Sequence, residues 1–167
     1  IHQFAELQLG HVEEFEEEVR DGVTLGQRIV PIKSVGAYVP GGGYPLLSSP
    51  LMSVIPADVA GVETISVAMP PQNDGVPHPA AVYGAIQAGA TEIYVMGGAQ
   101  AIAALATGTE SVSAVDKIVG PGNAFVTEAK KQVYGSVGID LLAGPSEILV
   151  IADETADTEI VAADLLA

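Results

Sequence analysis

From residue 35 onward, short apolar segments alternate with longer segments that are rich in alanine and other small residues. Four apolar segments have the length and composition of buried strands: 35–39, 64–69, 92–96 and 117–119. Four of the segments that follow have the pattern of helices: 49–60, 79–88, 99–106 and 124–134. This alternation is typical of βαβ units. It predicts an α/β fold with an open, mainly parallel, twisted sheet and helices on both faces.

The N-terminal segment has a different pattern. Apolar residues recur at helical spacing over residues 1–20, with glutamates between them. This spacing predicts an amphipathic helix that Asp21-Gly22 would end. Beyond the helix, the apolar pieces 23–25 and 28–32 are compatible with a hairpin.

Toward the C-terminus, the sequence predicts strands at 139–142 and 147–151 and a final helix over 157–167. The central sheet would be Rossmann-like but incomplete. The expected organisation has three parts: an N-terminal helix and connector (1–34), a Rossmann-like domain (35–146), and the truncated start of a return to a flanking domain (147–167).

Composition excludes several classes of protein. The chain has 167 residues, of which 49% are hydrophobic, and this excludes a mainly disordered state. It contains no Cys, which excludes a disulfide scaffold and a thiolate metal site. The longest uncharged stretch, 34–57, carries several Pro and Gly residues that disfavour a membrane helix.

The formal net charge of −15 argues against nucleic acid and anionic membranes as partners, since phosphate binding needs clustered Lys and Arg. Most of this charge lies in residues 1–21 and 147–167. Two explanations remain open. The acidic ends are solvated helix faces, or they meet basic surfaces of a longer chain or a second subunit.

Glycine-rich loops follow three of the expected strands: Pro40 to Gly43, Gly97-Gly98 and Gly120 to Asn123. In a parallel sheet these loops share the edge formed by the carboxyl ends of the strands, where ligands of open α/β sheets bind. Glycine lets backbone N–H groups approach a ligand, and a following helix N-terminus favours an anion. The loops therefore indicate a site for a nucleotide or another anionic small molecule, although none is a GxGxxG or Walker A motif.

Four polar residues lie in or beside these loops, and each also has a purely structural explanation. Tyr38 alternates with apolar residues and could belong to the core, and Asn123 precedes a helix that it could cap. Ser146 follows Gly-Pro and could belong to a turn. Gln100 lies in an otherwise apolar helix, where an isolated amide suggests a partner.

Classical catalytic groups are scarce. The three histidines are His2, His11 and His78, and no HExxH or GxSxG motif is present. His2 and His11 would lie near opposite faces of the expected helix, so they could not bind a metal ion together. The residues alone therefore indicate binding more clearly than catalysis.

Four blocks, in the same order and with the same spacing, resemble the histidinol dehydrogenase family over essentially the whole chain. They are VGAYVPGG (35–42), MGGAQAIAALA (96–106), DKIVGPGNAFV (116–126) and LAGPSE (142–147). The resemblance implies a cytoplasmic, zinc-dependent homodimer. Such an enzyme oxidises L-histidinol to L-histidine through an aldehyde, with two NAD, in histidine biosynthesis.

The resemblance also implies roles for single residues. Tyr38, Gln100 and Asn123 match the NAD contacts of the family, and Ser146 matches a substrate contact. The family's QAEH motif with its first zinc ligands would follow Ala167, and the catalytic Glu-His pair and the remaining zinc ligands would lie further on. We therefore expect no catalytic or metal-ligating residue in this chain, and for the chain alone no activity and at most weak NAD affinity.

One departure lies near the start, where Phe4-Ala5-Glu6 replaces the family's usual Phe-His-Glu. Two other interpretations of the chain remain open at this point. It could be a short, non-catalytic nucleotide-binding relative, or an acidic interaction scaffold whose glycine loops are only turns.

Overall fold

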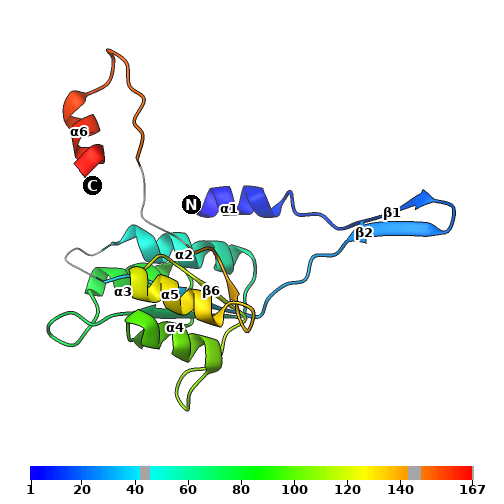
Figure 1. Ribbon diagram of the computed structural model, residues 1–167, viewed down its shortest axis with the longest axis horizontal. Coiled ribbons are helices and arrows are strands. Elements are labelled where there is room, and N and C mark those ends of the chain that lie inside the picture. The colour runs from blue at the N-terminus through cyan, green and yellow to red at the C-terminus, as the bar shows by residue number, and fades with distance from the viewer. Residues whose placement is uncertain (42–45, 143–147, 167) are drawn as a thin grey trace.

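A computed structural model describes residues 1–41, 46–142 and 148–166 (Figure 1). Its centre is a sheet of five parallel strands. In spatial order the strands are β5 (Glu92–Val95), β4 (Thr64–Met69), β3 (Ser34–Tyr38), β6 (Lys117–Val119) and β7 (Gly138–Ile139). The predicted α/β fold with a parallel sheet is confirmed.

Alternation of side chains along the strands gives the sheet two apolar faces. On one face, Ala37 and Val67 are buried with residues of α2 (Ser48–Val59) and α3 (Pro79–Gln87). On the other face, Tyr38 and Ile118 are buried with residues of α4 (Gly98–Thr107) and α5 (Ala124–Val133). Helices thus cover both faces, as the sequence pattern predicts.

The N-terminal prediction is wrong beyond residue 9. A helix, α1 (His2–Leu9), does form, but β1 (Phe15–Arg20) and β2 (Val23–Gln27) follow it as an antiparallel hairpin. The physical reason is the Asp21-Gly22 turn: Gly22 has a φ of 73°, and its N–H donates to Glu18 Oε1 at 2.7 Å. Asp-Gly favours a hairpin turn, so the chain reverses there.

Strand β2 pairs with β1, and residues 28–32 form no strand, so the expected pairing of 23–25 with 28–32 is also wrong. Figure 1 shows this hairpin projecting away from the sheet. Three of its apolar residues, Phe15, Val19 and Leu25, are each more than half exposed.

The C-terminal segment agrees with the sequence only in part. Of the expected strand at 139–142, only Ile139 lies in a strand, β7, and the helix α6 (Thr158–Leu166) forms as predicted. Residues 148–151 form no strand, which corrects the prediction for the described part of 147–151. Leu149 and Ile151 are 85% and 90% exposed, because no described strand pairs with this segment. Among the described helices, none has both the length and the apolar content that crossing a bilayer requires.

Candidate functional site at the carboxyl edge of the sheet

The order of the strands reverses at β3. From β3 the chain proceeds through β4 to β5 on one side, and then returns to place β6 and β7 on the other side. The loops after β3 and β6 therefore leave the sheet in opposite directions. In open α/β folds this point, outside the carboxyl ends of the strands, is where ligands bind.

Pro70 brings three of the loops at this edge together. It follows β4 and lies between Gly41, which follows β3, and Gly97, which follows β5. A Cβ atom on Gly41 would lie 2.5 Å from Pro70 Cγ, and one on Gly97 would lie 2.6 Å from Pro70 Cβ. The two glycines are therefore required for the close packing of these loops.

Tyr38 ends β3 and links it to the first turn of α4. Its side chain is only 4% exposed, and its hydroxyl oxygen accepts a hydrogen bond from the Gly98 N–H at 3.0 Å. The N–H groups at the start of a helix have no partner within the helix, so the phenol satisfies one of them. Tyr38 thus belongs to the core, as its structural explanation predicts, and its hydroxyl group lies at the carboxyl edge of the sheet.

Gln100 lies in the first turn of α4 and is exposed. Its side chain folds back toward the N-terminus of the helix, where Oε1 would lie 2.8 Å from a Cβ atom on Gly98. The amide is therefore beside Gly98, the glycine whose N–H group donates to Tyr38.

Asn123 is the N-cap of α5, as its structural explanation predicts. Its Oδ1 accepts hydrogen bonds from the N–H groups of Phe125 and Val126, each at 3.1 Å. Helices α4 and α5 pack against each other and both begin at the carboxyl edge. The structure thus brings Tyr38, Gln100 and Asn123 to one edge, while Ser146 lies outside the described residues.

Two residues that the sequence analysis missed hold the loop after β6. Lys130 Nζ donates to the Gly120 carbonyl oxygen at 3.1 Å and forms an ion pair with Asp140 Oδ1. Asp140 Oδ2 accepts a hydrogen bond from the Gly120 N–H at 2.8 Å. A signal was present in the sequence, because Lys130 stands on the apolar stripe of α5 between Val126 and Val133.

The ionisation of Asp140 is set by opposing effects. Burial alone would raise the pKa of its carboxyl group. The hydrogen bond from the Lys130 ammonium, together with the N–H groups of Leu141 and Gly120, outweighs burial and lowers the pKa below the ordinary value of 3.8. Asp140 is therefore a carboxylate at neutral pH, as an ion pair with Lys130 requires.

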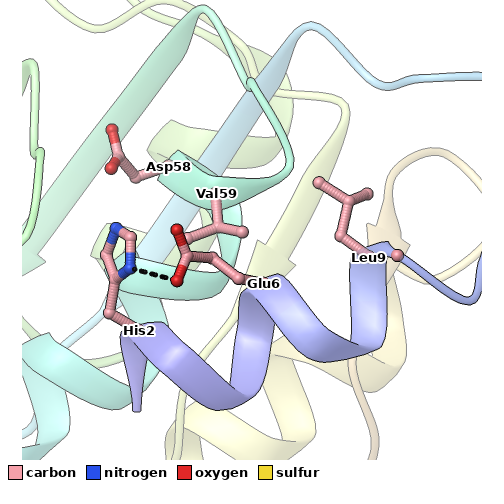
Figure 2. A pocket seen from close by; sticks show the side chains of 6 residues that line it. His2, Glu6, Leu9, Asp58 and Val59 are labelled. Carbon is pink, nitrogen blue, oxygen red and sulfur yellow. Dashed lines mark ion pairs between the residues drawn. The ribbon is translucent and has the colours of Figure 1, made fainter.

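A shallow pocket lies at the opposite edge, between α1 and the end of α2 (Figure 2). His2, Glu6, Asp58 and Val59 contribute to its lining. His2 Nδ1 lies 3.4 Å from Glu6 Oε2, and both side chains are more than half exposed. Because α2 runs from the carboxyl edge to the amino edge, this pocket is separate from the glycine loops.

The remaining histidines are not grouped. His11 follows the end of α1, and His78 is the N-cap of α3, where its Nδ1 accepts from the Ala80 N–H at 3.2 Å. Among the described residues, no group of three or more His, Asp or Glu side chains could hold a metal ion. The described part of the chain therefore does not fit a zinc ion, whereas its glycine-rich edge brings together the N-termini of α4 and α5, whose dipoles favour an anion.

Comparisons with known proteins agree with this architecture. A curated relative from Shouchella clausii, named "Histidinol dehydrogenase homolog", is 54% identical over 167 residues, which are 99% of this chain and 39% of the relative. The histidinol dehydrogenase of Methanothermobacter thermautotrophicus is 59% identical over 150 residues, which are 90% of this chain and 35% of that protein.

A solved structure of histidinol dehydrogenase from Elizabethkingia anophelis superposes with a TM-score of 0.87 at 46% sequence identity, covering 99% of this chain and 38% of that one. The chain thus spans between about a third and two fifths of the length of these relatives. The family model described as histidinol dehydrogenase matches residues 1–167. The chain belongs to the histidinol dehydrogenase family.

Proposed function

We propose that this chain is the NAD-binding portion of a zinc-dependent histidinol dehydrogenase. The complete enzyme would oxidise L-histidinol to L-histidine through an aldehyde, with two NAD, as a cytoplasmic homodimer. The proposal rests on the family and on one structural observation above all. Tyr38 at the end of β3, Gln100 in the first turn of α4 and Asn123 at the start of α5 lie at the edge of the sheet where the strand order reverses.

The three side chains have groups to offer a nucleotide. A phenol oxygen that accepts a hydrogen bond still carries its own proton, so Tyr38 can donate to a ligand while it binds the Gly98 N–H. The cap at Asn123 uses Oδ1, which leaves the role of donor to Nδ2. Gln100 is exposed beside Gly98 and adds a second amide.

In the complete enzyme these residues would bind and orient the dinucleotide, and Ser146 would contact the substrate. Bound NAD supplies the hydride acceptor. We propose that residues 35–146 form the nucleotide-binding domain, and that 1–34 and 147–167 belong to a flanking domain. The chain alone should not turn over histidinol, because it contains neither the zinc ligands nor the catalytic Glu-His pair that the family implies.

The test is a calorimetric titration of the purified chain with NAD, for the wild type and for Asn123→Asp. Aspartate caps a helix about as well as asparagine, so the thermal stability should be unchanged. The change replaces an amide donor by a carboxylate, which should weaken NAD binding by at least about tenfold through repulsion of the phosphates.

Gln132→Glu is the matched control, since it makes the same chemical change near the other end of α5, where Gln132 is exposed. The control should bind NAD like the wild type. Equal affinities of wild type and Asn123→Asp, or no binding by the wild type, would contradict the proposal.

A further inference from the structure

Lys130 is a buried cation in a chain with few cations. Its side chain is 5% exposed, although α5 has an exposed face where a lysine would be fully hydrated, as the neighbouring Lys131 shows at 66%. Removing an ammonium group from water is strongly unfavourable unless it is paired and hydrogen-bonded. The structure supplies Asp140 and the Gly120 carbonyl oxygen as partners.

Both backbone polar groups of Gly120 are bound by this pair. Asp140 accepts from its N–H, and Lys130 donates to its carbonyl oxygen. Gly120 has a φ of 111°, and a Cβ atom there would overlap the Tyr38 carbonyl oxygen. The loop therefore begins in a conformation that favours glycine and in contact with the end of β3. The side chains of Lys130 and Asp140 bind the same glycine.

The three participants come from different elements. Gly120 follows β6, Asp140 follows β7, and Lys130 lies ten residues after Gly120 on the helix that Asn123 caps. The pair thus fixes the start of the loop relative to the body of its helix. Asp140 also precedes by a few residues the segment 143–147 that contains Ser146.

A buried ion pair is an inefficient way to gain stability, because well-packed apolar residues of similar volume often stabilise a protein equally or better. An ion pair does, however, impose directional hydrogen bonds that apolar packing cannot impose. Here those bonds point at one glycine of the candidate nucleotide site.

We propose that Lys130 and Asp140 are positioning residues, which hold the Gly120–Asn123 loop in the conformation that binds the nucleotide. This inference rests on the proposed function. It assigns the pair to the geometry of the site rather than to the stability of the fold, and this distinction can be measured.

The experiment compares thermal stability and NAD affinity in the wild-type chain, Lys130→Met, and the double variant Lys130→Met/Asp140→Leu. The single variant leaves a buried carboxylate unpaired, so both its stability and its affinity should fall. The double variant removes both charges, and its thermal midpoint should return toward that of the wild type. Its NAD affinity should remain at least about tenfold weaker, because nothing holds Gly120.

Lys131→Met is the matched control, since it removes the adjacent exposed lysine, and it should bind NAD like the wild type. A double variant that regains stability and affinity together would overturn the inference while leaving the proposed function intact. A wild-type chain that does not bind NAD would overturn the proposed function and this inference with it.

If circular dichroism shows that the double variant does not fold, Asp140→Asn decides the question. Its amide oxygen can still accept from the Gly120 N–H, but it no longer pairs with a charge. A loss of NAD affinity with a folded chain supports the inference, and an unchanged affinity overturns it.

Discussion

An aspartate accepts backbone hydrogen bonds at each edge of the sheet, Asp116 at the amino edge and Asp140 at the carboxyl edge. The two aspartates differ in their exposure to water. At the amino edge, Asp116 Oδ2 accepts from the N–H groups of Lys33 and Ser34, each at 2.9 Å, and from the Ser34 hydroxyl at 3.1 Å. Asp116 is exposed, and these bonds join the starts of β3 and β6. Water can solvate whatever part of the carboxylate the protein leaves open.

At the carboxyl edge, Asp140 likewise accepts from backbone N–H groups, but it is partly buried and shares a cation with Gly120. The carboxylate at the amino edge is thus hydrated, whereas the carboxylate at the carboxyl edge is partly desolvated and paired with a buried cation. The difference indicates that exact loop position matters at the carboxyl edge, whereas the amino edge needs only to keep two strands in register.

The largest effect is expected from Gly120→Ala. The new Cβ would overlap the Tyr38 carbonyl oxygen in a left-handed conformation, so strain and overpacking together should cost about 2–5 kcal/mol of stability. NAD binding should be lost as well. Thermal unfolding and calorimetry measure the two effects.

Gly61→Ala is the matched control at the other edge. Gly61 has a φ of 75° and nothing within 4 Å of an added Cβ, so only the backbone strain of about 1–2 kcal/mol remains. Equal losses of stability in the two variants would show that the contact between Gly120 and Tyr38 is unimportant.

A smaller effect, confined to acid pH, is expected from Asp116→Asn. Hydrogen bonds from the Lys33 N–H, and then from Ser34, lower the pKa of Asp116 below the ordinary value of 3.8. A carboxyl with a lowered folded-state pKa stabilises the fold above its unfolded pKa, and this contribution is lost as pH falls through the folded pKa. The stability of the wild type should therefore decrease below about pH 4.

The amide that replaces the carboxyl group does not titrate, so the acid-side slope should be shallower in Asp116→Asn, as measured by urea unfolding between pH 5 and 2 at roughly half-unit steps. NAD affinity at neutral pH should not change. A loss of affinity would break the contrast between the two edges, because it would connect Asp116 to the nucleotide site.

The smallest effect is expected from His2→Ala in the pocket at the amino edge. His2 and Glu6 form an exposed pair one helical turn apart, and such pairs contribute less than about 0.5 kcal/mol. Neither stability nor NAD affinity should change measurably. A clear loss of NAD affinity would mean that this pocket, and not the glycine loops, receives the nucleotide.

The central part of the fold could be predicted because its signals are local. Segments such as 64–69 are apolar, short and bounded by turn residues, and each is followed by a helix with a recognisable cap or a terminal glycine. The prediction of a helix beyond residue 9 failed because Val12, Phe15 and Val19 recur at helical spacing, although the segment 15–20 pairs as a strand. Asp21-Gly22 can either end a helix or form the turn of a hairpin. In the structure it forms the turn between β1 and β2.

The prediction of a strand at 148–151 failed for another reason. Their composition favours a strand, but a strand exists only with a partner, and no described segment pairs with them. The contacts of Lys130 and Asp140 with Gly120 could not be predicted for the same reason, since only the fold brings these residues together. The sequence could place Tyr38 and Asn123 at the carboxyl edge, because Tyr38 lies near the end of a predicted strand and Asn123 follows another in a glycine-rich loop.

The packing of Gly41 and Gly97 around Pro70 has a consequence for how this edge responds to a ligand. The loops after β3 and β5 both pack against the proline ring of the loop after β4, so we expect a displacement of that ring to disturb both neighbours. A spectroscopic label on one of these loops should therefore detect ligand binding at any of the three, because the loops would move together.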